Sequence, residues 1–150
     1  NNRGEHDLSA YEEKGAKGLG FAGKIPQIFE ISMGTDRLFY LLLFSSFRKD
    51  ENRAWLSMNS AISPFKAAIF PLVSKDNLDV KAMSIFNGSR FRNDILYSDN
   101  GSIGKRYRRA EEIGIKIAFT VDYDTMADNT ITVRESDSMK QLLFFRCNHL

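Results

Sequence analysis

The sequence contains few of the residues that hold metals or form cross-links. Its 150 residues include one cysteine, Cys147, and two histidines, His6 and His149. A single cysteine excludes an intrachain disulfide framework and a multi-cysteine metal site. Structural zinc needs more soft ligands than these, and two histidines near the chain ends argue against Ser-His-Asp catalysis. We therefore expect no bound metal and a reducing compartment.

Long apolar runs and a large excess of one charge are also missing. The run from Leu38 to Phe44 is far shorter than the ~20 residues that span a bilayer, which predicts a buried helix segment and no membrane partner. Because the net charge is only +2, a site for a polyanion must come from local clustering. The first residues are polar and charged, which does not match a signal peptide. Because the sequence starts at Asn1 without a methionine, we expect it to be a fragment of a longer chain.

Basic residues cluster in one segment, residues 99–114. Its Asn- and Gly-containing start predicts a turn, followed by a helix with Ser102 as N-cap and Gly114 just past the end. Ile103, Tyr107 and Ala110 form an apolar stripe at helical spacing. Four cations are expected on the solvent faces: Lys105, Arg106, Arg108 and Arg109. These cations and the free amides at the helix start suit an anionic backbone. On composition alone, a solvated basic helix with Glu111 and Glu112 as local counter-charges is slightly favoured.

Other phosphate-binding and catalytic patterns do not match. The segment 101–106 resembles a P-loop only superficially, because its glycines are too close and no hydroxyl follows the lysine. No Gly-x-Gly-x-x-Gly follows a strand. Asp122 and Asp124 have no base partner and are interpreted as a solvated turn.

The hydrophobic periodicity predicts alternating strands and helices. Residues 25–33 are expected to form a strand and residues 35–47 a helix, followed by a charged linker at 49–53 and a short strand at 55–58. Pro64 marks a boundary because it disfavours helical angles at the residue before it. The expected elements after it are strands 67–72, 95–97, 115–121 and 129–134 and helices 77–92, 102–113 and 138–145, an α/β order with a mixed sheet flanked by helices.

Several motifs together resemble one protein family. The run Gly101–Arg109 followed by residues 112–114 resembles a signature of the dimeric type of glycyl-tRNA synthetase. Further matches follow the family's order at residues 64–73, 120–126, 128–134 and 137–141. The resemblance implies the mixed, mostly parallel five-stranded anticodon-binding fold of class IIa synthetases over residues 59–150. In such a domain the candidates for contacts with the tRNA phosphates are Lys105, Arg106, Arg108 and Arg109. We expect about half of them to touch RNA, because the others would pair with Glu111, Glu112 or Asp99.

A second resemblance concerns residues 30–37, which are similar to motif 3 of class II synthetases. In the family an arginine lies against ATP, a role that suits a guanidinium and that falls on Arg37. The family's glycine-binding glutamate and serine fall on Glu30 and Ser32. Ile31 and Met33 depart from the family pattern. The alternative is that Arg37 only pairs with a neighbouring carboxylate.

These resemblances imply a particular division of labour. Residues 1–58 would be the C-terminal piece of a class II catalytic domain. The full-length protein would be an ATP-dependent glycine–tRNA ligase, with Mg and with glycine and tRNA as partners, acting as a homodimer in the cytoplasm or alternatively the mitochondrion. Because motifs 1 and 2 are missing, this chain alone is expected to be inactive and to hold no bound ATP.

Two other functions fit part of the pattern. A synthetase-like accessory subunit of a mitochondrial DNA polymerase would use the same fold to bind nucleic acid without catalysis. Retention of Glu30, Ser32 and Arg37 argues against it, whereas Ile31 and Met33 argue mildly for it. A stand-alone domain for tRNA-like structures ranks last, because it leaves residues 1–58 unexplained.

Overall fold

The structure is a computed structural model that describes residue 18 and residues 31–144. The chain divides into two compact units, Asn1–Leu42 and Leu43–Leu150. The second unit therefore begins before the predicted domain boundary at residues 58 and 59.

Helix α2, Thr35–Ser46, matches the predicted helix and begins at the expected residue. Its apolar side chains do not match the prediction of a buried segment, because Leu38, Phe39 and Leu41 are each more than half exposed. The sequence thus predicted the helix correctly and its burial wrongly. Apolar composition shows which surface favours burial, but another part of the molecule must cover that surface.

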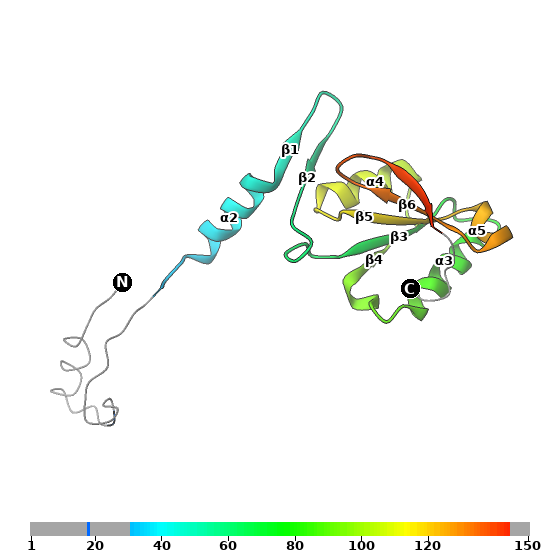
Figure 1. Cartoon of the computed structure of the whole chain (residues 1–150), viewed down its shortest axis with the longest axis horizontal. Helices are drawn as coiled ribbons and strands as arrows, with labels where there is room; N and C mark the ends of the chain where they lie inside the picture. The colour runs from blue at the N-terminus through cyan, green and yellow to red at the C-terminus, as the bar shows by residue number, and fades with distance from the viewer. Residues whose placement is uncertain (1–17, 19–30, 145–150) are drawn as a thin grey trace. The chain divides into compact units, whose positions relative to one another are not determined.

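A five-stranded sheet forms the centre of the second unit, with the strand order β4-β3-β5-β6-β7. Figure 1 shows β3, β4, β5 and β6 beside one another. β3 (Ala67–Pro71) pairs in parallel with β4 (Ile95–Tyr97) and β5 (Ile117–Val121), whereas β6 (Ile131–Glu135) pairs antiparallel with β5 and with β7 (Gln141–Phe144). The predicted mixed sheet is confirmed, with two parallel and two antiparallel pairs rather than a parallel majority.

Helices cover both faces of this sheet. Alternate residues of β3 point to opposite faces, and each set packs against a different helix. Ala67 and Ile69 pack with α3 (Leu78–Gly88), in a core that includes Leu78 and Ala82. Ala68 and Phe70 pack on the other side with α4 (Ile103–Glu112). All five residues of β3 are buried, as predicted for a strand covered on both faces.

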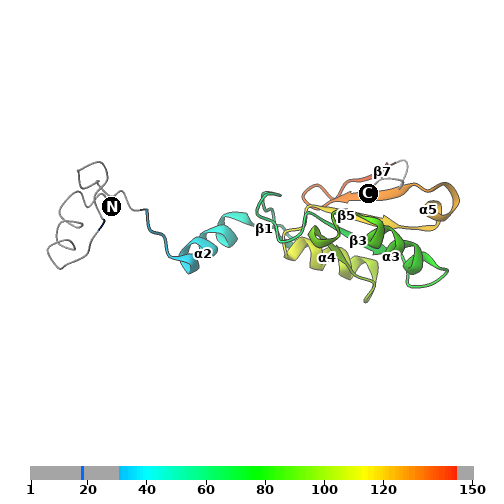
Figure 2. The same ribbon diagram turned by 90° about the horizontal axis from the view of Figure 1, so that it is seen from below.

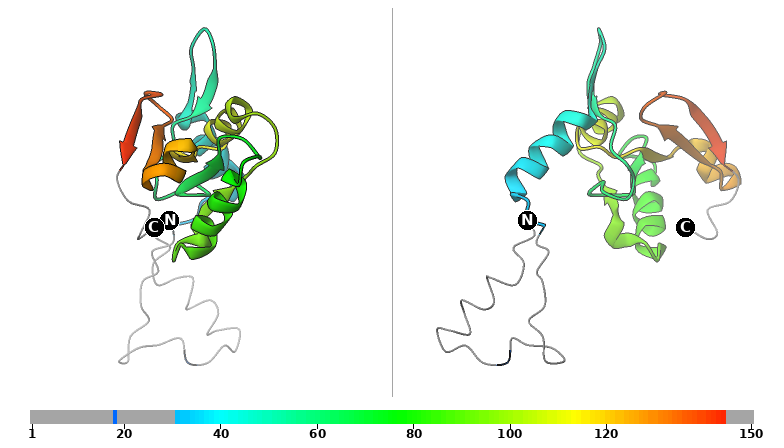
Figure 3. Two further views of the ribbon diagram at one scale, coloured as in Figure 1. Left: turned by 90° about the vertical axis from the view of Figure 1, so that its right-hand side faces the viewer. Right: turned by 60° about the vertical axis from the view of Figure 1, so that its left-hand side comes forward.

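The segment predicted as a charged linker is the turn of a hairpin. β1 (Phe47–Lys49) pairs antiparallel with β2 (Ala54–Leu56), and the hairpin projects from the sheet domain (Figures 1 and 3). Asp50 closes the turn by accepting hydrogen bonds from the backbone amides of Asn52 and Arg53, both at 2.8 Å. These bonds lower the pKa of the Asp50 carboxyl.

Two predicted elements differ from the structure. The segment 122–128 was interpreted as a turn, but it contains the short helix α5 (Tyr123–Asp128). A capping box between Asp122 and Thr125 stabilises the start of this helix. The predicted final helix at 138–145 is wrong, because residues 141–144 pair with β6 as strand β7, at the outer edge of the sheet (Figure 2). The predicted strand at 25–33 lies largely outside the described residues, and residues 31–34 form neither helix nor strand.

Candidate nucleic-acid interface

Helix α4 presents three of the four predicted cations to solvent. Lys105, Arg108 and Arg109 are exposed, and their three- and four-residue spacing puts them on one side of the helix. Within the described part of the chain none of the three forms an ion pair. Ser102 is the N-cap, as predicted, but its side chain makes no capping hydrogen bond. The start of α4 therefore combines amides that Ser102 does not cap with three cations that have no carboxylate partner among the described residues.

Arg106 does not belong to this exposed face. Its side chain is buried, with only 2% of the residue exposed. The guanidinium donates hydrogen bonds to the carbonyl oxygens of Pro71, Leu72 (3.2 Å) and Ser98 (3.4 Å). Burial lowers the pKa of Arg106, an effect that Asp99 opposes. The prediction of a solvent-facing Arg106 is wrong: this side chain joins the carboxyl ends of β3 and β4.

The carboxyl ends of the parallel strands form a rim next to the start of α4. In doubly wound sheets ligands bind at this edge, where connections leave a central strand in opposite directions. Here the Ser74 hydroxyl donates to the Asp99 carbonyl at 3.0 Å, and the Tyr123 hydroxyl donates to the Asp76 carboxylate at 2.8 Å. That second bond raises the pKa of Tyr123. Asp76 and Asn77 both have positive φ, a conformation that concentrates at functional sites.

Tyr123 is a candidate that the sequence interpretation missed. The residue is 53% exposed at this rim, and its hydroxyl donates a hydrogen bond to the Asp76 carboxylate. The available signal was an aromatic residue directly after a buried strand, but the two flanking aspartates favoured a solvated turn. An exposed, oriented ring can stack on an unpaired base.

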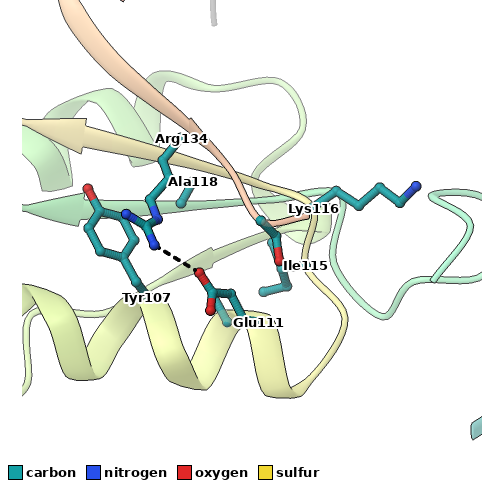
Figure 4. Close-up of a pocket in the computed structure, with 8 residues that line it drawn as sticks. Tyr107, Glu111, Ile115, Lys116, Ala118 and Arg134 are labelled. Atoms are coloured by element: carbon teal, nitrogen blue, oxygen red, sulfur yellow. Dashed lines mark hydrogen bonds and ion pairs between the residues drawn. The ribbon is translucent and has the colours of Figure 1, made fainter. Parts of the chain in front are cut away.

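A cluster of charged side chains connects α4 to the hairpin and to β6. Glu111 lies 3.3 Å from both Arg53 and Arg134, each through a different carboxylate oxygen. Arg53 also donates to the carbonyl oxygens of Ser136 and Asp137 and stacks on Trp55, with its guanidinium carbon 3.9 Å from the ring centroid. The Glu111–Arg134 pair lies beside a small cavity of about 10 Å³ (Figure 4). Glu111, predicted as a local counter-charge for the basic helix, instead stabilises the tertiary structure.

The residues proposed for ATP and glycine lie before the sheet domain. Arg37 is exposed in the first turn of α2, and Ser32 is exposed just before that helix. Glu30 lies outside the described residues, as do Cys147 and both histidines. Within residues 31–144 Arg37 forms no ion pair. The assignments of Arg37, Ser32 and Glu30 stay predictions.

The described part of the chain lacks two further features. In that part of the chain no group of three or more His, Cys, Asp or Glu side chains could hold a metal ion. None of its helices is long and apolar enough to cross a membrane.

Comparison with known proteins assigns the sheet domain to a family. The profile of a family described as "Anticodon binding domain" matches residues 66–146, which contain every strand of the sheet and both covering helices. The chain belongs to the anticodon-binding domain family. The fold implied by the resemblance is thereby confirmed.

Individual relatives extend this anticodon-binding domain match. A glycine–tRNA ligase of Malacoplasma penetrans is 38% identical over 151 aligned positions, which cover 93% of this chain and 32% of the relative. A glycine–tRNA ligase of Methanocaldococcus jannaschii is 43% identical, covering 79% of this chain and 21% of the relative. A glycine–tRNA ligase of Mycoplasma genitalium is 37% identical, covering 93% of this chain and 33% of the relative. The chain thus spans about a third or less of the length of these relatives, and the similarity to glycyl-tRNA synthetases is confirmed.

Proposed function

We propose that this chain is the part of a glycine–tRNA ligase that binds the anticodon of its tRNA. The observation that carries the proposal is the exposed cationic face of Lys105, Arg108 and Arg109 on α4, inside a domain of the anticodon-binding family. Cations of this kind hold phosphates, whereas splayed anticodon bases are recognised by stacking and by hydrogen bonds to their edges. Arg106 is removed from the RNA-contacting set because it is buried.

Tyr123 adds a base-contacting group to this proposal. Tyr123 is exposed at the carboxyl ends of the parallel strands, where α4 also begins. We therefore propose that one single-stranded loop places a phosphate on Lys105 and a base on Tyr123. Substituting Tyr123 by Leu removes the aromatic ring and is expected to weaken RNA binding about ten-fold. Tyr123→Phe keeps the ring and retains most of the affinity.

In the longer protein, residues 1–58 would contribute to the catalytic domain, with Arg37 against ATP and Glu30 and Ser32 around glycine. Catalysis would come from positioning and from electrostatic stabilisation of the ATP phosphate that glycine attacks to give glycyl-adenylate. ATP, Mg, glycine and a second subunit belong to that longer enzyme, and we propose a cytoplasmic location. Full-length protein that fails to glycylate tRNA would refute this assignment and favour the polymerase accessory subunit.

The cationic face is tested by replacing Lys105, Arg108 and Arg109 together with Gln. A matched control replaces Lys49, Arg90 and Arg92, which are also exposed, so that both variants lose three charges. The salt dependence of tRNA binding is expected to become shallower by two to three units of slope in the first variant alone. Equal slopes in the two variants would show that α4 does not contact the phosphates.

A further inference from the structure

A hollow lies between the hairpin and α4, and the proposed contacts of the cationic face with phosphates do not use it. This hollow has a volume of about 280 Å³ and lies between the hairpin turn, α4 and the segment around Met139. We call it the hairpin pocket, and its principal lining residues are Asp50, Arg53, Gly104, Tyr107, Arg108 and Arg134. Its size is close to the lower end of the range for small-ligand sites.

The pocket adjoins the cationic face directly. Gly104, Tyr107, Arg108 and Glu111 stand at positions i, i+3, i+4 and i+7 and therefore share one side of α4. Arg108 belongs both to this side and to the cationic face. A chain whose phosphate lies on Arg108 can thus place the attached group in the pocket without crossing another element.

One wall of the pocket is a flat cation held in a fixed orientation. The guanidinium carbon of Arg134 lies 4.6 Å from the centroid of the Tyr107 ring. Glu111 fixes the same guanidinium at 3.3 Å, and the Tyr107 hydroxyl is fixed by Thr120 at 2.5 Å. A planar guanidinium of this kind is a surface on which a base can stack.

The remaining polar groups favour an anion that also carries hydrogen-bond donors. Arg53, Arg108 and Arg134 face Asp50 and Glu111, so that three cations and two carboxylates give the pocket one net positive charge. The Asp50 carboxylate accepts hydrogen bonds from two backbone amides, and these bonds lower its pKa. Met139, at the same pocket, has a φ of 56°, a conformation that non-glycine residues rarely adopt.

We propose that the hairpin pocket binds one unpaired nucleotide of the RNA that α4 holds. Its phosphate lies on Arg108, its base lies against the Arg134 guanidinium, and amino or imino groups on the base edge face Asp50. A base inside a duplex has its face and edge occupied, so the pocket selects single-stranded RNA. This inference rests on the proposed function, because it names a second contact of the same RNA.

Gly104 offers a way to fill the pocket without removing any of its polar groups. No atom lies within 4 Å of the position that a Cβ would occupy there, and the φ of Gly104 is outside the left-handed region. Gly104→Ala is therefore compatible with α4, and in a helix alanine is favoured over glycine. Gly104→Leu places a larger side chain toward the hollow.

The test uses the full 150-residue chain as wild type, Gly104→Ala and Gly104→Leu. AMP, CMP, GMP and UMP are titrated separately while the backbone amide signals of residues 104 and 108 are followed by NMR. At least one nucleotide is expected to shift both signals in wild type and Gly104→Ala, and not in Gly104→Leu. The Gly104→Leu variant is also expected to bind glycine tRNA transcript about ten-fold more weakly than Gly104→Ala.

The inference fails if none of the four nucleotides shifts these signals. It also fails if both glycine variants bind the transcript with equal affinity while their thermal unfolding is unchanged. Failure of the proposed function gives a different result, in which transcripts with and without the glycine anticodon bind equally to the wild-type chain. Nucleotide shifts that Gly104→Leu abolishes, together with the ten-fold loss, support the pocket.

Discussion

Replacing Arg106 with Met is expected to destabilise the sheet domain rather than to weaken RNA binding. Methionine keeps an unbranched side chain but removes the guanidinium donors. Three carbonyl oxygens, of Pro71, Leu72 and Ser98, then lose their hydrogen bonds in a buried environment. At about 1 kcal/mol net for each bond, the loss is about 3 kcal/mol. Because small domains are stable by only ~5–15 kcal/mol, this is a large part of the total.

The assay is urea unfolding of the whole chain, with Arg109→Met as the matched control. Arg109 is exposed on the same helix and forms no ion pair within the described residues, so its replacement is expected to change stability by less than ~0.5 kcal/mol. With a urea dependence of ~2 kcal/mol per molar, Arg106→Met shifts the midpoint by about 1.5 M. Equal midpoints, combined with weaker tRNA binding by Arg106→Met alone, would refute the structural role and return Arg106 to the RNA-contacting set.

Three further predictions concern the residues around α4 and the hairpin. Glu111→Gln removes the charge between Arg53 and Arg134, and thermal unfolding is expected to show a loss of about 2–3 kcal/mol; an unchanged midpoint would mean that the cluster contributes nothing. Gly114→Ala places a Cβ 2.7 Å from the Met58 sulfur at a φ of +82°, at a cost of about 2 kcal/mol, and an effect below ~0.5 kcal/mol would contradict this geometry. Because the pKa of Asp50 is lowered in the folded state, its carboxylate stabilises the fold at pH values above the ordinary pKa of aspartate. This contribution is lost as the pH falls through the lowered pKa. NMR titration of the Asp50 carboxyl should show this, and a pKa at or above the ordinary value would contradict it.

Periodicity predicted the central elements of the fold well. β3 is a continuous apolar run buried on both faces, and α4 begins after Ser102 and ends before Gly114, as the sequence indicated. The helix α5 was missed although Asp122 and Thr125 have the spacing of a capping box. Its six residues are too few for a hydrophobic period to appear, so only the cap carried the signal.

The C-terminal element was predicted wrongly for a different reason. A short apolar run such as residues 142–145 fits a helix and a strand equally well, since neither period is expressed over so few positions. Pairing with β6 decides the outcome, and this long-range interaction is not visible in the local sequence. The strand propensity of a segment depends on the neighbour that it pairs with.

The candidate site shows the same limit. The sequence identified the basic helix, and exposure of Lys105, Arg108 and Arg109 agrees with that interpretation. Arg106 differs only because the strand ends beside it present carbonyl oxygens, which the sequence does not reveal. The hairpin pocket likewise depends on Arg53 and Arg134, which are distant in sequence and brought to α4 by Glu111.

The most direct test of the proposed function measures binding of the chain to tRNA with the glycine anticodon, in competition with a transcript that differs only in the anticodon. The experiment is run at several salt concentrations with wild type and the Lys105/Arg108/Arg109 variant. Anticodon recognition by the sheet domain predicts a preference for the glycine transcript that persists at moderate salt, with overall affinity falling in the variant. Equal binding to both transcripts, and to duplex DNA as well, would contradict the account and leave only a nonspecific cationic surface.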